Sequence, residues 1–155
     1  MHTFFLQQTI DLAKQNVQTG GGGPFAAIIC QNQQIISAGS NSVTVNNDPT
    51  AHAEIMAIRA ACTKLDTFQL TGCILYSNCE PCPMCLGAIY WARIKQVYFA
   101  CNRDDAAQAG FDDRFIYEQI AKAPEQRKIA MQQLPLKEAL SPFVAWQEQE
   151  NRTPY

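Results

Sequence analysis

The stretch from His52 to Cys85 reads HAEIMAIRAACTKLDTFQLTGCILYSNCEPCPMC. Asp48 and Thr50, just before it, are residue types that cap helices, and they predict a helix from about Ala51 to Lys64. A short apolar run from Cys73 to Tyr76 then predicts a strand that leads into a proline-rich turn. The stretch therefore indicates a helix, a strand and the start of another helix, with histidine and cysteine at the turning points.

The second helix is expected to begin at the turn EPCPMC and to end near Arg93. Leu86, Ile89 and Tyr90 are predicted to pack its apolar side into the core. The segment QVYFAC, residues 96–101, predicts another strand after this helix.

The N-terminal part predicts a helix and a hairpin. Between Phe4 and Val17, apolar residues recur at helical spacing, with Leu6, Ile10, Ala13 and Val17 on one face. GGGGP ends this helix, and the residues from 25 to 39 predict a hairpin of two strands around QNQ. SNSVTVNNDP is expected to be a loop. Strands and helices in this order predict a central sheet covered by helices on both faces, with right-handed crossovers.

Composition limits the class of protein. With 155 residues and 47% hydrophobic content, the chain is expected to form a single domain over residues 1–155, in which residues 136–155 are a C-terminal helix and tail. A net charge of -2 argues against a broad basic surface that binds nucleic acid. No apolar run approaches the roughly 18 residues of a membrane span, and the N-terminus lacks signal-peptide features. We expect a cytoplasmic protein that binds neither nucleic acid nor membranes.

The chain has seven cysteines, an odd number that does not favour a disulfide framework. Cys30, Cys62, Cys73 and Cys101 have apolar neighbours, and we expect them to be small core residues.

His52, Cys82 and Cys85 have the chemistry of a zinc site. The C-x-x-C pair lies in the first turn of a helix, on one face, where the partial positive charge of the helix end lowers the pKa of thiols. Three ligands with a fourth position left for water describe a catalytic zinc site. Residues two apart on a regular helix point to opposite sides, so His52 and Glu54 can share a site only over the open N-terminal end of their helix. We expect the site between two helix N-termini at the edge of the sheet.

Other interpretations of these residues are open. The two cysteines could be a redox pair, or a closed structural zinc site could use Cys79 as a fourth ligand. His52 could also be an ordinary core histidine. Against all three, H-x-E followed by P-C-x-x-C is the signature of zinc-dependent base deaminases, in which the glutamate is a general acid and base outside the metal shell.

HAE and EPCPMC, together with NDPTAHAE, CLGAIYWAR, DAAQAGFDD, LSPFVAW and the final Tyr155, resemble the cytidine deaminase superfamily and, within it, the bacterial guanine deaminases. The resemblance covers nearly the whole chain. One departure is Ala26, which stands where the resemblance leads us to expect glycine. It implies a three-layer α/β/α fold with a central mixed sheet. It also implies Zn²⁺ bound by His52, Cys82 and Cys85, with Glu54 as the catalytic carboxylate.

Asn41 is a substrate contact by this resemblance, although asparagine is also a common turn residue. Guanine presents two adjacent donors, N1–H and the 2-amino group, which need an acceptor such as a carboxylate. The resemblance favours Asp113 for this contact and as a catalytic proton carrier, whereas an ordinary role would be to cap the helix near Arg114. Phe25, Trp91 and Tyr155 could wall a flat slot for the purine, or simply pack in the core.

The resemblance implies hydrolytic deamination of guanine to xanthine and ammonia, with a small-molecule purine as substrate. Members of the superfamily are commonly dimers or larger, so it also implies a homodimer. The alternatives are a tRNA adenosine deaminase, which shares both motifs, and a structural zinc protein without activity. The C-terminal NRTPY is predicted to be a lid over the site, in its own subunit or a partner.

Overall fold

The structure, a computed structural model, describes Met1–Tyr155. It divides into two units, Met1–Asp113 and Arg114–Tyr155. The expectation of one domain over residues 1–155 stays a prediction. None of the helices combines the length and the hydropathy that a membrane span requires.

A mixed sheet forms the centre of the first unit. Its four strands lie in the order β2-β1-β3-β4. They are β1 (Ala26–Gln31), β2 (Gln34–Ser40), β3 (Cys73–Cys79) and β4 (Gln96–Cys101). β1 is antiparallel to both of its neighbours, whereas β3 and β4 are parallel. The predicted hairpin is confirmed, and its turn uses Asn32 and Gln33, both with positive φ, as a type I′ hairpin turn requires.

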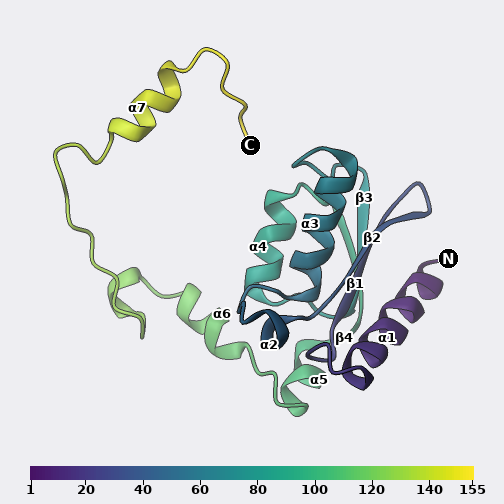
Figure 1. Ribbon diagram of the computed structural model, residues 1–155. Coiled ribbons are helices and arrows are strands. Elements are labelled where there is room, and N and C mark those ends of the chain that lie inside the picture. The colour runs from purple at the N-terminus through teal and green to yellow at the C-terminus, as the bar shows by residue number, and fades with distance from the viewer. The chain divides into compact units, whose positions relative to one another are not determined.

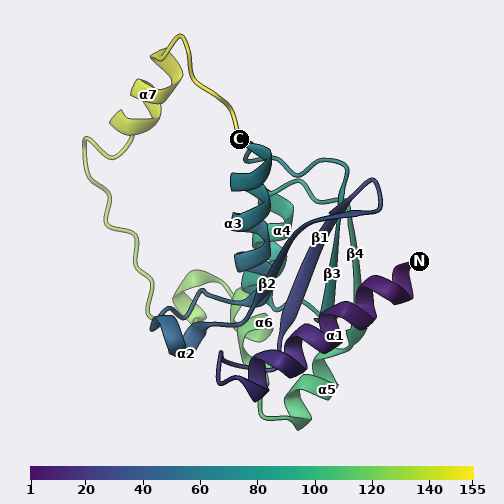
Figure 2. The ribbon, with the colours of Figure 1, turned by 45° about the vertical axis from the view of Figure 1, so that its right-hand side comes forward.

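Helices cover both faces of this sheet (Figure 1). The first unit contains α1 (His2–Gln18), α2 (Val43–Asn46), α3 (Ala53–Leu65), α4 (Pro83–Trp91) and α5 (Arg103–Gln108). α1 lies on one face, and α3 and α4 lie on the other, an arrangement that is clearest in the turned view (Figure 2). The predicted three-layer arrangement is therefore confirmed.

Each face of the sheet has its own core. Beneath α1, Phe5 packs with Ile28, Cys30 and Tyr76. On the other face, a larger cluster joins α3 and α4 to the sheet and includes Ala27, Ile29, Ala53, Ala57, Leu75 and Ile89. The small residues of α3, Ala53, Ala57 and Ala61, allow the helix to pack closely against the strands. This packing sets the distance between the N-terminus of α3 and the sheet.

Several sequence predictions about side-chain burial were wrong. In α1 the buried stripe is Phe5, Thr9 and Ala13, while Ile10 and Val17 are exposed, because the helix is rotated by about one residue from the predicted face. In α4 Ile89 is buried as predicted, but Leu86 and Tyr90 are exposed. The α4 helix carries apolar residues on all of its sides, so its sequence does not indicate which side packs against the core.

Other differences concern element bounds and cysteines. Cys30 and Cys73 are buried and Cys62 is half-buried, but Cys101 is exposed. Part of the predicted loop SNSVTVNNDP forms the short helix α2. α5 follows β4 directly, begun by a capping box in which Asn102 and Asp105 bind each other's backbone amides.

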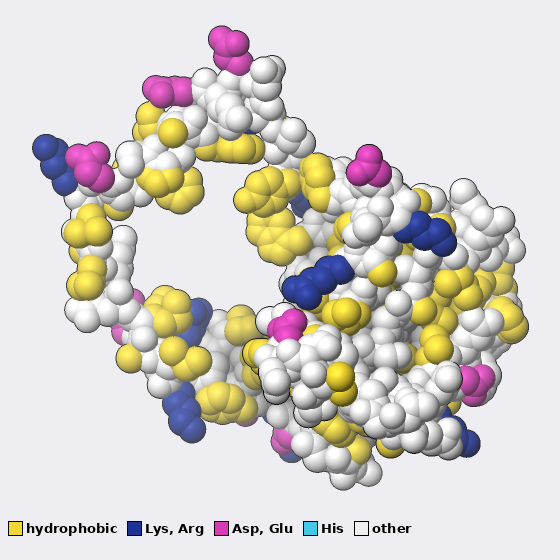
Figure 3. All heavy atoms as spheres, viewed as in Figure 1, with side chains coloured by type: hydrophobic (Ala, Val, Ile, Leu, Met, Phe, Trp, Pro, Cys, Tyr) yellow, Lys and Arg dark blue, Asp and Glu magenta, His cyan; other side chains and the backbone are white.

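The second unit is a chain of short helices. It contains α6 (Arg114–Ile120), the 3-10 helix η1 (Pro124–Gln126) and α7 (Ser141–Glu148). The predicted helix from about Leu136 is shorter than expected and begins at Ser141, with Pro142 in its first turn, where proline is tolerated. No residue of the second unit is buried, and the large apolar side chains of this unit are exposed (Figure 3). Among them are Ile129, Leu134, Leu136, Leu140 and Phe143.

Candidate active site

The predicted metal ligands meet between the first turns of two helices. His52 is the N-cap residue of α3, and Cys82 is the N-cap residue of α4, both with extended backbone. Pro83 occupies the first turn of α4, where its missing amide costs no helical hydrogen bond. Because His52 lies outside the helical turn, its side chain can converge with that of Glu54, two residues later, over the open helix end.

The ligand atoms fit a tetrahedral zinc ion. His52 Nδ1 lies 3.5 Å from Cys82 Sγ and 3.6 Å from Cys85 Sγ. In a tetrahedral site, zinc bonds of about 2.3 Å to sulfur and 2.05 Å to nitrogen place the two ligand atoms about 3.6 Å apart. All three atoms lie within 4.8 Å of one another. One imidazole and two thiols are also donors that zinc prefers, so the set suits Zn²⁺.

Glu54 lies beside this ligand set and is buried, with 6% of its surface exposed. Its Oε2 accepts a hydrogen bond from Cys85 Sγ at 3.4 Å, and its Oε1 accepts one from Ser77 Oγ at 3.4 Å. Burial raises the pKa of this carboxyl above the usual range. A carboxyl with a raised pKa, at the edge of a metal site, suits proton transfer.

Without a metal ion, the ligands share protons among themselves. Hydrogen bonding from Cys85 lowers the pKa of the Cys82 thiol to about 4, with His52 adding to the effect. Cys85 has a single thiol proton to share between Cys82 and Glu54, and the hydrogen bond to Cys82, followed by burial, raises its pKa. The hydrogen bond to Cys82 likewise raises the pKa of His52. The site is therefore prepared to hold one thiolate, and metal binding would displace the remaining proton.

The side-chain amide of Asn41 is hydrogen-bonded through its oxygen and not through its nitrogen. Its Oδ1 accepts from the backbone amides of Gly23 at 3.2 Å and Val43 at 3.3 Å. The residue is 8% exposed, and its Nδ2 makes no hydrogen bond in the structure. Its side chain can therefore offer a donor, but no free acceptor, to a ligand.

Phe25 and Asp113 lie in the same unit as the metal ligands. Phe25 makes an edge contact with Phe111, with ring centroids 4.9 Å apart. Burial raises the pKa of Asp113, and the charge on Cys82 raises it further. The role of Asp113 at the substrate stays a prediction.

Trp91 and Tyr155 are more exposed than expected for walls of a slot. Trp91 ends α4 with 64% of its surface exposed. Tyr155 belongs to the second unit, where its ring makes an edge contact with Trp146. Their roles at the substrate stay predictions.

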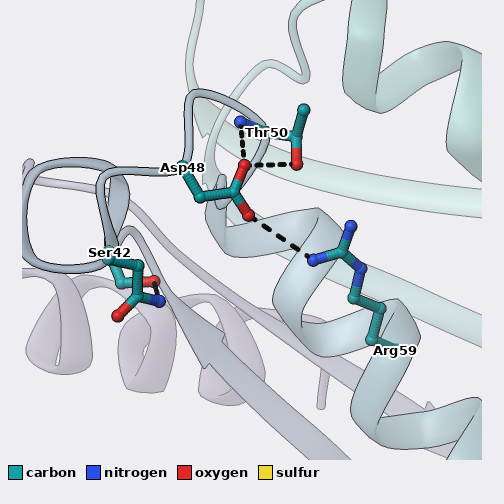
Figure 4. A network of polar contacts seen from close by, with 5 residues as sticks. Ser42, Asp48, Thr50 and Arg59 are labelled. Carbon is teal, nitrogen blue, oxygen red and sulfur yellow. Dashed lines mark hydrogen bonds and ion pairs between the residues drawn. The ribbon is translucent and has the colours of Figure 1, made fainter.

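Asp48 and Thr50 do not cap α3, contrary to the sequence prediction. Asp48 Oδ1 instead accepts bonds from the amide and the hydroxyl of Thr50, at 2.8 and 2.7 Å, which closes a turn before the helix (Figure 4). Its Oδ2 faces Arg59 at 3.7 Å. This turn delivers His52 to the N-cap position, where the residue is free to serve as a ligand.

The sequence interpretation missed the polar residues that hold the loops of the site. Asn78, on β3, binds the backbone of Pro24 and Ala26, on both sides of Phe25. Asn16, on α1, donates to the carbonyls of Gly23 and Asn41. Ser77 binds Glu54. The only signal was the polar pair Ser77–Asn78 in an otherwise apolar strand before CEPC.

Comparison with known proteins agrees with this geometry. Residues 1–101 match the model of the cytidine and deoxycytidylate deaminase zinc-binding region. The chain belongs to the cytidine and deoxycytidylate deaminase family. The deaminase fold and the zinc chemistry predicted from the sequence are confirmed by this match and by the ligand cluster.

Individual members of the deaminase family differ in how much of the chain they match. Guanine deaminase of Bacillus subtilis (strain 168) is 54% identical over 154 residues, or 99% of each chain. Its X-ray structure matches 100% of this chain and 99% of its own, with a TM-score of 0.98. A structure of guanine deaminase from Nitrosomonas europaea is 34% identical, with a TM-score of 0.67, over 70% of this chain and 63% of its own. The tRNA-specific adenosine deaminase of Aquifex aeolicus is 44% identical over 97 residues, 63% of this chain and 64% of its own.

Proposed function

We propose that this deaminase hydrolyses guanine to xanthine and ammonia. The observation that carries the proposal is the likeness to a guanine deaminase along 99% of both chains. The tRNA-specific adenosine deaminase matches 63% of the chain. The likeness to guanine deaminase therefore includes Asp113 and the whole second unit.

His52, Cys82 and Cys85 would hold the zinc ion. A zinc ion bound there supplies Lewis acidity, which makes a water molecule nucleophilic at neutral pH. Two thiolates balance its charge, so Glu54 is not drawn in as a further ligand by excess positive charge.

Glu54 would move the protons of the reaction. Its carboxylate accepts a proton from the attacking water and delivers it to N3 of guanine, while C2 is attacked. The same group can then assist the departure of the 2-amino group as ammonia. Its buried position keeps bulk water from competing for the proton.

Asn41 and Asp113 would recognise the base. Because Asn41 has only its Nδ2 free, it must donate, and it suits an acceptor of guanine such as O6 or N7. Asp113 would accept from N1–H and the 2-amino group, and it could carry a proton to the leaving amine. Adenine lacks the N1–H donor, so it would leave the Asp113 carboxylate without its partner, which costs on the order of 1 to 3 kcal/mol.

Phe25, Trp91 and Tyr155 are proposed to contact the faces of the purine. The support is strongest for Phe25, whose backbone is held on both sides by Asn78 and whose ring is braced by Phe111. A ring held in this way can serve as a rigid apolar wall.

We also propose that the protein is a cytoplasmic homodimer. The second unit has no core of its own, and its exposed apolar side chains need a partner surface. All seven cysteines are free, which suits a reducing compartment.

The test is ammonia release from guanine, adenine, cytosine and guanosine by the purified protein, followed for the wild type and Glu54→Gln. Guanine should be the preferred substrate. Glu54→Gln should keep one zinc per chain but lose roughly 10²- to 10⁴-fold in kcat, because the proton carrier is gone while the metal ligands remain. Comparable kcat/KM on adenine would refute guanine specificity, and full activity of Glu54→Gln would refute the mechanism.

A further inference from the structure

Ser77 is a buried hydroxyl in the middle of the strand that leads to the metal ligands. It lies on β3, two residues before the strand ends, and is 1% exposed. Its neighbours in the strand are mostly apolar, and its Oγ has two hydrogen-bond partners, the Cys79 amide and Glu54.

The direction of both hydrogen bonds follows from these partners. The amide of Cys79 can only donate, so Ser77 Oγ accepts from it at 3.4 Å. The hydroxyl proton is then left for the other partner. It points to Glu54 Oε1 at 3.4 Å, and an ionised carboxylate can only accept. Ser77 is thus oriented by the backbone of its own strand to donate to Glu54.

The two oxygens of Glu54 have different partners. Oε1 receives the hydroxyl of Ser77, whereas Oε2 receives the thiol of Cys85. When Cys85 binds a metal as a thiolate, it has no proton to donate, and Oε2 loses this partner. The hydrogen bond from Ser77 to Oε1 does not depend on the metal.

We propose that Ser77 is a positioning residue for Glu54: it anchors Oε1 and leaves Oε2 as the oxygen that carries the proton. This role rests on the proposed function of Glu54 as the proton carrier. A carboxylate held at one oxygen keeps the other within a few tenths of an ångström of a productive geometry, which proton transfer requires. Ser77 acts through Glu54 and does not itself touch the substrate.

The experiment compares Ser77→Ala with a matched control, Ser37→Ala. Ser37 is also buried on a strand, 8% exposed, and its Oγ donates to a carbonyl of α3, Ala57 O, at 2.8 Å. Both variants lose one buried hydroxyl that links the sheet to α3, but only Ser77→Ala removes a donor to Glu54. We expect Ser77→Ala to lower kcat for guanine about tenfold while KM and zinc content stay near wild type. Ser37→Ala should keep the wild-type kcat.

Several results would overturn the role of Ser77. They are a wild-type kcat in Ser77→Ala, an equal loss of kcat in both variants, or a rise in KM with unchanged kcat. A crystal structure of Ser77→Ala gives a reading that does not depend on activity: the Glu54 carboxylate should turn away from its wild-type position, and an unmoved carboxylate would refute the role. If the wild type does not deaminate guanine, the proposed function fails, and the crystal structure still decides whether Ser77 positions Glu54.

Discussion

Glu54 and the metal ligands depend on one backbone detail, the extended conformation of His52. With φ -71° and ψ 156°, His52 stands outside the first turn of α3, and Glu54 stands inside it. A helical His52 would point to the opposite side from Glu54. The turn closed by Asp48 and Thr50 precedes the start of the helix, so two residues outside the metal site help to set its geometry.

Asp48 makes this turn sensitive to acid. Its pKa is lowered, first by the hydrogen bonds from Thr50 and then by Arg59. Because the pKa in the folded state lies below the value of 3.8 for the free group, the carboxylate stabilises the protein above that pH. The contribution is lost as the pH falls through the folded-state pKa.

The variant Asp48→Asn should therefore have a lower thermal midpoint than the wild type from roughly pH 7 down to pH 5, with a difference that shrinks below about pH 4. Thermal unfolding at a series of pH values measures this difference. Asp66→Asn, which removes an acidic group at the other end of α3, is the control. A difference that persists unchanged at low pH would show that Asp48 stabilises the turn without its charge.

The ligands could be predicted from the sequence, whereas Ser77 could not. The spacing of H-x-E and P-C-x-x-C is local, and the residue types carry the chemistry. Ser77 and Glu54 are 23 residues apart, and their contact exists because α3 packs over β3 at one height. The distance between α3 and β3 depends on how the two elements pack, which the sequence near Ser77 does not indicate.

Gly39 allows the close packing of β2 and α3. A Cβ at this position would collide with the carbonyl oxygen of Ala53 and would lie 2.5 Å from the amide nitrogen of Ala57. Both are backbone atoms of α3, so the helix would have to move. Because His52 and Glu54 lie at its N-terminus, the movement would displace a ligand and the proposed proton carrier together.

Gly39→Ala should lower the free energy of unfolding by about 1 to 3 kcal/mol and also weaken zinc retention. Gly87→Ala is a matched control, since a Cβ there meets nothing within 4 Å in the middle of α4. Alanine favours a helix at such a position and should raise stability by about 0.4 to 1 kcal/mol. Denaturant unfolding and zinc analysis of both variants measure the effect, and an unchanged Gly39→Ala would contradict close backbone packing as the cause.

Elements were easier to predict than their faces. Periodicity and turn residues located the four strands and the long helices. The buried side of α4 was mispredicted because Leu86, Ile89 and Tyr90 are all apolar. Only Ile89 is buried, because it packs in the cluster formed by residues of the strands and of α3. Period alone cannot rank three apolar residues on a helix that is apolar all round.

For the whole molecule, the two units contribute differently to stability. Every buried residue lies in Met1–Asp113, and Arg114–Tyr155 has none. A segment of this kind gains little from folding alone, because it removes little apolar surface from water. Its apolar residues are therefore expected to act in an assembled protein, as the proposed homodimer requires.

The C-terminal NRTPY is proposed to close over the bound purine, in its own subunit or in a partner. Deamination gains from a site without bulk water, because charge interactions are stronger there. Pro154 stiffens the end of the chain, and Tyr155 supplies an aromatic face and a hydroxyl. Removing residues 151–155 deletes no metal ligand and no buried residue, so the zinc content and the thermal midpoint should stay near wild type.

The truncation should nevertheless lower kcat/KM for guanine at least about tenfold, equivalent to about 1.4 kcal/mol of transition-state stabilisation. Tyr155→Phe is the matched variant: it keeps the aromatic face and removes the hydroxyl, so full activity there would assign the effect to the ring. Steady-state kinetics of both variants, beside zinc analysis and thermal unfolding, measure the prediction. If the truncated protein turns over guanine like the wild type, the tail does not cover the site, because a lid that can be removed without loss excludes no water that matters to the reaction.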